Sequence, residues 1–194
     1  MFDALLQNVR KHISLTAEEE TFFTSLFQKK LIRKKQFLLQ EGEVAKHLFF
    51  VLDGCLRSYS IDKNGFEHIL QFAPPGWWIT DMYSITVQQP ATLYIDVIFD
   101  GEVLAISKED IDRIFEQLPQ FNRYFRILAE NSLVTYQRRL IDNLSLSALE
   151  RYQGFCQYYP SLIETLPQKL VAAYIGVTPE FLSKMLNSKM PAGK

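Results

Sequence analysis

Evenly spaced glycines constrain the fold of this chain more than any other feature. They stand at Gly42, Gly54, Gly65 and Gly76, separated by twelve, eleven and eleven residues. Between residues 31 and 106 the segments are short, rich in β-branched and aromatic side chains, and often alternate apolar with polar. Regular turn signals at this interval predict successive antiparallel strands in a sandwich or barrel.

Helix signals flank this strand region on both sides. Thr16, with Glu19 three residues later, forms a capping box ahead of apolar residues at helical spacing. Ser107 and Asp110 make a similar start for a second helix, which Pro119 ends or bends. The strands are therefore expected to be preceded and followed by helices.

A longer helix is predicted from about Gln120 to Asn143. A mostly apolar stripe follows one of its faces: Phe121, Phe125, Leu128, Ser132, Tyr136 and Leu140. Such a stripe packs either on the chain's own core or against a second copy across a dimer interface. The residues alone leave both alternatives open. A further helix follows, and Pro160 ends it.

Composition excludes several classes of protein. A hydrophobic content of 47% suits a well-filled core, and a net charge of -1 argues against a chain that is basic all over. Cys55 and Cys156 are far apart and lack CxxC spacing, so we expect free thiols in a reducing cytoplasm. There is neither a signal-peptide pattern nor an apolar run of roughly 20 residues, so a soluble cytoplasmic protein is expected.

The segment Leu166–Ser188 reads as two short helices with a tight turn between them. Pro167 stands where the first helix opens, and Gly176 where the chain must turn. Thr178 and Pro179 then begin the second helix. The apolar side of this second helix is expected to consist of Phe181, Leu182, Met185 and Leu186. This spacing is typical of a helix-turn-helix, although an ordinary pair of packed helices has the same pattern.

The same end of the chain is basic. From Leu166 onward four lysines, Lys169, Lys184, Lys189 and Lys194, stand against the single acid Glu180, a net +3. The rest of the chain therefore carries the compensating negative charge. This asymmetry favours a DNA-facing terminus.

Taken in order, these segments resemble the catabolite-activator, or Crp/Fnr, family of bacterial transcription regulators, and the short members of that family most of all. The matching segments are "EGE", "LFFVLDGCLRSY", "DKNGFEHIL", "PPGWW" and "GVTPEFLSKML". The resemblance implies an α+β fold with a cyclic-nucleotide-binding-type β-roll over 1–119. It also implies a dimerising helix over 120–143 and a helix-turn-helix domain over 144–194.

Carried over by position, the recognition helix is Thr178–Asn187. The side chains expected to contact DNA are Gln168, Lys169, Thr178, Pro179, Glu180, Ser183 and Lys184. Glu180 could accept a hydrogen bond from cytosine N4, and Lys184 could reach guanine or a phosphate. Pro179 stands where better-known members often carry arginine, so a different DNA sequence is expected to be read. Only seven residues follow Asn187, so we expect either a subgroup without the usual hairpin wing or a truncated chain.

The expected effector pocket departs from the family pattern. Its residues are Trp78, Thr80, Asp81, Met82, Tyr83, Ala91 and Thr92. Asp81 falls where ligand-binding relatives use a glutamate for the ribose, and Ala91 where an arginine pairs with the phosphate. Residues 64–107 contain no lysine or arginine, and burying a phosphate without a cation is unfavourable. We therefore expect no cofactor and no cyclic AMP; the pocket either takes an unidentified effector or is filled by its own aromatic side chains.

Other classes of function fit the residues less well. A cupin-type metal site would have to use His47, His68 and Glu67, which lack the close spacing of a ligand pair. No serine elbow, P-loop or HExxH motif is present. We predict a protein that is not an enzyme and binds no metal. Its expected partners are double-stranded DNA, a second copy and RNA polymerase, and no membrane. The alternative is a β-roll ligand- or partner-binding module that does not bind DNA.

Overall fold

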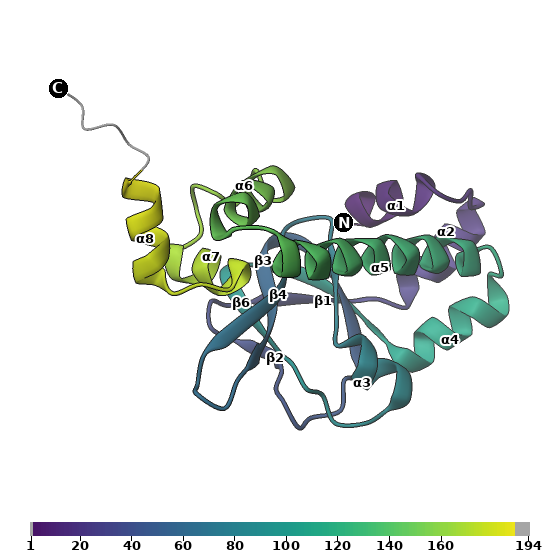
Figure 1. The fold of residues 1–194 in the computed structure, drawn as a ribbon. Helices are drawn as coiled ribbons and strands as arrows, with labels where there is room; N and C mark the ends of the chain where they lie inside the picture. Colours follow the sequence, from purple (N-terminus) through teal and green to yellow (C-terminus); the bar gives the residue numbers. More distant parts are fainter. Residues whose placement is uncertain (1, 189–194) are drawn as a thin grey trace. The chain divides into compact units, whose positions relative to one another are not determined.

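The computed structural model describes residues 2–188 of the 194, and Figure 1 shows its ribbon. The described chain divides into two compact units. The first contains the residues up to Ser60 together with Gln71–Ser132, and the second contains Ile61–Leu70 and the residues from Leu133 onward. Both units share the long helix, which was predicted as a segment of its own over 120–143. Those domain boundaries stay a prediction.

Helices and strands follow the order that the sequence predicts. From the N-terminus to the end of the strand region the elements are α1 (Asp3–Arg10), α2 (Ala17–Ser25), β1 (Gln28–Ile32), β2 (Phe37–Leu39), β3 (His47–Ile61), β4 (Glu67–Ala73), β5 (Trp78–Ile79), α3 (Met82–Val87) and β6 (Tyr94–Ser107). The remaining elements are α4 (Lys108–Gln117), α5 (Phe121–Ser145), α6 (Ala148–Tyr158), α7 (Gln168–Ile175) and α8 (Pro179–Asn187).

The strands form one antiparallel roll in the order β1-β6-β3-β4, with β2 on β6 and β5 on β3. The long strands β3 and β6 pair from His47 opposite Ser107 to Tyr59 opposite Tyr94. Between these ends the register shifts, and the two backbones approach closely. A Cβ on Gly101 would lie 2.1 Å from the Asp53 carbonyl oxygen, so only glycine fits there. The predicted α+β class with a β-roll, a long helix and a terminal helix pair is confirmed.

Local sequence signals explain how the flanking helices begin. Thr16 and Glu19 form the predicted capping box: the Glu19 N–H donates to Thr16 Oγ1 at 3.2 Å, and the Thr16 N–H donates to Glu19 Oε2 at 2.8 Å. Ser107 accepts from the Asp110 N–H at 3.0 Å and begins α4. Both helix starts are therefore determined by residues within one turn.

The helix α5 has two halves with different surroundings. Phe121 and Tyr124 are fully buried in the core of the first unit, and Phe125 and Leu128 pack against that core. Past Ser132 the large apolar side chains are exposed instead: Leu133 (67%), Val134 (63%), Tyr136 (44%), Leu140 (61%), Ile141 (54%) and Leu144 (79%). The first half of the predicted stripe is therefore intramolecular core, and the large apolar side chains of the second half are exposed in the described part of the chain.

The two cysteines are free, as expected, and differ in accessibility: Cys55 is buried and Cys156 is half-buried. Burial raises the pKa of the Cys55 thiol from an ordinary value near 9 to about 12. No helix in the part of the chain that the structure describes is long and apolar enough to span a bilayer.

Cys55 is expected to make the protein less stable in alkali. Between pH 9 and 12 the unfolded thiol loses its proton while the folded thiol keeps it. The free energy of unfolding should therefore fall by about 1.4 kcal/mol per pH unit above pH 9 from this group alone. Urea unfolding at pH 8 to 11 should show a flatter pH dependence for Cys55→Ala than for the wild type. Cys156→Ala is the control, and equal slopes for both variants would contradict the assignment.

Candidate nucleic-acid interface and effector pocket

The helix pair α7–α8 is joined by the tight turn that the sequence predicts. Gly176 ends α7 in the left-handed conformation, with φ +74°, and its N–H donates to the Ala172 carbonyl. Thr178 caps α8 by accepting from the Phe181 N–H at 3.2 Å, and Pro179 follows in the first turn. Pro167 occupies the N-cap position of α7 and not its first turn.

Packing of α8 differs from the expectation at one residue. Leu182 is fully buried, and Met185 and Leu186 are half-buried, as predicted. Phe181 is 52% exposed, so its assignment to the buried side was wrong. At 3.6 residues per turn, adjacent positions point about 100° apart, so Phe181 and Leu182 cannot both face the centre of the contact with α7.

A shallow concave surface runs along α8 and reaches the start of α7. The residues that line it are Gln168, Pro179, Glu180, Ser183, Lys184, Asn187 and Ser188, here called the α8 face. Five of the seven predicted DNA-contacting residues therefore lie together. Thr178 uses its hydroxyl as the helix cap, and Lys169 is exposed on α7 but does not line the face. Sequence reasoning missed Asn187 and Ser188, although their spacing of four from Ser183 and Lys184 was a signal.

The α8 face carries a positive charge, on Lys184, that is available to a ligand. Lys184 forms no ion pair with any residue that the structure describes, although Glu180 lies four residues before it. An exposed, unpaired ammonium can neutralise a phosphate without first breaking an internal contact. The exposed Glu180 and Asn187 supply acceptor and donor groups of the kind that read base edges.

In the roll, the expected pocket residues are used mainly for the protein's own structure. Trp78 donates its Nε1–H to the Tyr124 hydroxyl at 2.9 Å, and its ring packs 5.0 Å from that of Phe50. Asp81 is 1% exposed and caps α3, with one oxygen accepting from the Ser84 N–H at 2.9 Å and the other from the Thr92 N–H at 3.2 Å. Both Asp81 oxygens therefore hold the local backbone.

The other expected pocket residues are divided between the surface and the interior. Met82 and Tyr83 are exposed, Ala91 is buried, and Thr80 donates its hydroxyl to the His47 carbonyl at 3.0 Å. Thr80 also lines a cavity of about 370 Å³, which is otherwise bounded by Leu38, Leu39, Glu43, Val44, Ala45, Lys46, His47, Phe49 and Ile95. The roll therefore contains a cavity, but it lies mostly beside residues 38–49 and not beside the expected set.

A lysine and a histidine at this cavity were missed by the prediction, because it searched for positive charges only after Lys63. Lys46 and His47 both line the cavity. Burial, followed by the charge of Lys30, lowers the pKa of His47 and favours the neutral imidazole. The signal that could have found them is their position directly before or at the start of the strand β3.

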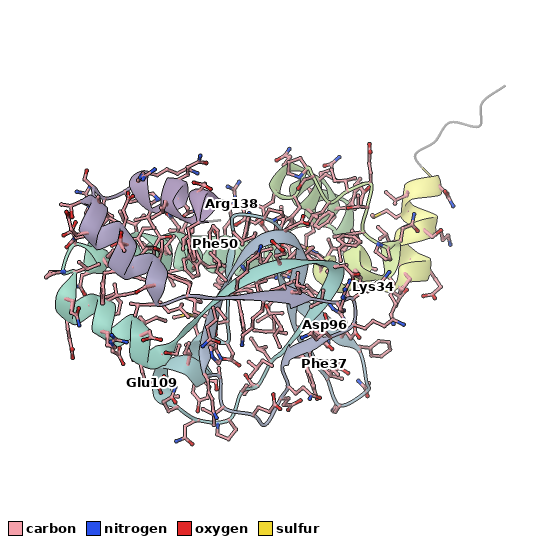
Figure 2. All side chains as sticks on the ribbon, turned by 180° about the vertical axis from the view of Figure 1, so that it is seen from behind. Lys34, Phe37, Phe50, Asp96, Glu109 and Arg138 are labelled. Atoms are coloured by element: carbon pink, nitrogen blue, oxygen red, sulfur yellow. The ribbon has the colours of Figure 1, made fainter. Side chains whose placement is uncertain are left out.

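Arg57 is a further cation of the roll. It also lies outside residues 64–107, the range that contains no lysine or arginine. Its Nε donates to Asp96 Oδ1 at 2.7 Å and its Nη2 to Oδ2 at 2.9 Å, and both residues are buried. The guanidinium also lies 4.0 Å from the centre of the Tyr59 ring. Figure 2 labels Asp96 beside Phe37, its partner on β2. Because the two charges cancel in a bidentate pair, Arg57 offers no free cation to a phosphate.

Comparison with known proteins agrees with this architecture. Residues 29–118 match the cyclic nucleotide-binding domain. An anaerobic regulatory protein of Aggregatibacter actinomycetemcomitans is 24% identical over 82% of this chain and 65% of its own length. A cyclic AMP receptor protein of Thermus thermophilus is 24% identical over 92% of this chain and 84% of its own. The structure of FixK2 from Bradyrhizobium japonicum superposes with a TM-score of 0.72 at 20% identity, over 84% and 83% of the two chains.

Residues 29–118 are a cyclic nucleotide-binding domain, and the chain is similar to regulators of the Crp/Fnr family over most of its length. The resemblance seen in the sequence is therefore confirmed. The relatives named above are regulatory proteins, and the prediction that the chain is not an enzyme agrees with them. Among the described residues, no three His, Cys, Asp or Glu side chains gather as a metal site would need. The chain spans just under two thirds of the length of the first Crp/Fnr relatives it matches.

Proposed function

We propose that this chain is a DNA-binding transcription regulator of the Crp/Fnr type that reads double-stranded DNA with the α8 face. One observation carries the proposal: five side chains expected to contact DNA lie on one exposed surface of a capped helix pair, with an unpaired lysine among them. The second helix of such a pair enters the major groove in proteins of this architecture. The protein would work in the cytoplasm, where its DNA is, and activation would require contact with RNA polymerase.

The proposal includes a homodimer built on the second half of α5. Leu133, Leu140 and Leu144 recur at intervals of seven and four, with Val134 and Ile141 beside them, and all five are more than half exposed. A helical stripe of this kind is typical of a coiled-coil interface. Two-fold-related α8 helices would then read half-sites about one helical turn apart.

An effector, if the roll takes one, would not be cyclic AMP under this proposal. Asp81 holds the backbone at both oxygens, Ala91 is apolar, and Arg57 is neutralised by Asp96. The cyclic phosphate would therefore lack the ion pair that compensates its desolvation. The 370 Å³ cavity beside Lys46 and His47 is the place where another small molecule would bind.

Fluorescence anisotropy of labelled DNA from upstream of this chain's own coding region, against scrambled DNA, tests the proposal. Tighter binding to the native DNA, with an affinity that falls steeply as salt rises, is expected because phosphate contacts release counterions. Absence of binding at low salt, with and without cyclic AMP, would refute the DNA-binding role. The chain would then be a ligand- or partner-binding module.

Lys184→Gln is expected to weaken DNA binding about equally for native and scrambled sequences. Loss of one phosphate contact should reduce the slope of log affinity against log salt by about 1. The matched control is Lys63→Gln, which removes an exposed lysine from the turn between β3 and β4, outside the α8 face. An unchanged salt slope in the Lys184 variant would mean that this side chain does not contact phosphate.

Leu140→Glu is expected to convert a dimer into a monomer. The substitution places a carboxylate in the middle of the exposed stripe, opposite its own copy, where desolvation and repulsion oppose association. Light scattering after size exclusion should give the mass of one chain, 22.6 kDa, in place of twice that value. Asn122→Glu, at an exposed position in the first turn of α5, should leave the mass of the dimer unchanged. An unchanged mass for both variants would place the interface elsewhere.

A further inference from the structure

Two arginines, from α5 and α6, hold the C-terminal end of α7. Arg139 donates Nη2–H to the carbonyls of Tyr174 at 2.7 Å and Ile69 at 2.5 Å, and Nη1–H to that of Leu70. Arg151 donates Nε–H to the Ile175 carbonyl at 2.9 Å and Nη1–H to that of Leu146 at 2.7 Å. The last carbonyls of a helix lack partners within the helix and carry partial negative charge, so cations there are stabilising.

Neither guanidinium pairs with a carboxylate of a residue that the structure describes. Apart from the Tyr174 ring, 3.8 Å from the Arg139 guanidinium, these backbone carbonyls are the only partners of the two side chains among the described residues. The Nη2 group of Arg151 and the Nε–H of Arg139 donate to no described residue. Since no described side-chain nitrogen is both fully buried and unpaired, each of these donors keeps some exposure to solvent. Helix carbonyls offset only part of two full positive charges.

Both arginines line a cavity of about 230 Å³. Its other lining residues are His68, Ile69, Asn143, Ala173, Tyr174, Ile175 and Gly176. No described acidic side chain lines it. His68 Nε2 is hydrogen-bonded to Asp62 Oδ2, at 3.0 Å. The cavity is therefore positively charged.

A second cavity, of about 470 Å³, adjoins the first and shares five lining residues with it: Arg139, Asn143, Arg151, Tyr174 and Ile175. Its aromatic lining comes from Phe155, Tyr158 and Tyr174. Arg138, labelled in Figure 2, adds a third guanidinium. Two acids also line this cavity, Asp142 and Glu150, but Glu150 is held by Ser147 in the capping box of α6. The large cavity thus adds two aromatic side chains, Phe155 and Tyr158, to the arginines and Tyr174 that line the small one.

We propose that the small cavity, here called the α7 anion pocket, binds the phosphate of a small phosphorylated organic molecule whose flat body lies in the adjoining aromatic cavity. Guanidinium groups match the oxygens of a phosphate and bind it with charge-assisted hydrogen bonds. A phosphate monoester carries up to two negative charges, which would balance Arg139 and Arg151. The site is separate from the α8 face and from the roll cavity, so it goes beyond the proposed function.

Calorimetric titration of the full chain with phenyl phosphate, in a chloride buffer of fixed ionic strength, tests the pocket. Phenol and inorganic phosphate are titrated in the same way. Phenol measures the contribution of the aromatic ring alone, and inorganic phosphate measures that of the phosphate alone. Phenyl phosphate is expected to bind, inorganic phosphate to bind more weakly, and phenol not to bind. Absence of phenyl phosphate binding at millimolar concentration would overturn the proposal, and so would phenol binding as tightly as phenyl phosphate.

Asn143→Asp is the decisive variant. Asn143 is exposed, lines the pocket and makes no side-chain hydrogen bond to a described residue, so the change leaves the carbonyl contacts of both arginines in place. A carboxylate beside the guanidiniums should weaken phenyl phosphate binding by about tenfold or more. Ser161→Asp adds the same charge to the second unit at an exposed position outside both cavities and should change the affinity less than about twofold. Equal weakening in both variants would indicate general charge attraction and overturn the site. The experiment needs no DNA, so its failure leaves the DNA-binding proposal intact.

Discussion

Leu182→Asp is expected to unfold the helix pair α7–α8 and abolish DNA binding, while the roll stays folded. Leu182 is fully buried, on the side of α8 that packs against α7. An unpaired carboxylate at such a site costs several kcal/mol, about 4 or more, and an eight- or nine-residue helix cannot persist without its packing. The roll has a core of its own in the first unit, which this substitution does not touch.

Hydrogen exchange followed by mass spectrometry measures this effect segment by segment. Peptides from α7 and α8 should exchange as fast as an unfolded chain, whereas β3 and β6 keep their protection. The control is Phe181→Asp, one residue away but 52% exposed, which should cost less than about 1 kcal/mol. Retained protection in α8 of the Leu182 variant would show that the helix pair is held by something other than this contact.

Asp96→Ala is expected to destabilise the roll by about 3 to 5 kcal/mol. The substitution leaves the Arg57 guanidinium buried without its bidentate partner, and an uncompensated buried charge is costly. Urea unfolding followed by tryptophan fluorescence should report the loss, because Trp78 packs in the core of the same unit. The midpoint should move to lower urea with little change in slope.

The double variant Arg57→Leu with Asp96→Leu distinguishes the contribution of the ion pair to stability from that of the packing around it. Replacing both charges by apolar groups removes the desolvation cost together with the attraction, so its stability should be within about 2 kcal/mol of the wild type. A double variant as unstable as Asp96→Ala would mean that the pair is not the reason for the loss. The Tyr59 ring over Arg57, or the packing of β3 on β6, would then be the main contribution.

Features that depend on residues close together in the sequence could be predicted from the sequence alone. The capping box of Thr16 and Glu19, the Ser107 start of α4 and the Gly176 turn before Thr178 each depend on contacts within about one helical turn. The strands between the spaced glycines follow from the same kind of local pattern. Most of the α8 face was predictable as well, because positions three and four apart on a helix share a side.

Side-chain roles that depend on distant partners could not be predicted in this way. Asp81 lies where a ligand-binding acid was expected. Its second oxygen, however, accepts a hydrogen bond from the N–H of Thr92, eleven residues away, so both carboxylate oxygens are used within the protein. Arg57 stands as an isolated cation in the sequence and becomes half of a neutral pair only when β3 lies beside β6. Whether a charged side chain is neutralised depends on which strands lie side by side in the fold. A short stretch of sequence does not contain that information.

By itself, the sequence determined the order of the elements, their caps and turns, and the resemblance to Crp/Fnr regulators, because these depend on short-range periodicity and on residues whose backbone preferences are strong. Only the tertiary structure decided which half of α5 is buried, where the roll is hollow, and that Arg139 and Arg151 meet at the end of α7. Burial and electrostatic balance are properties of groups that lie far apart along the chain, and folding is what brings them together.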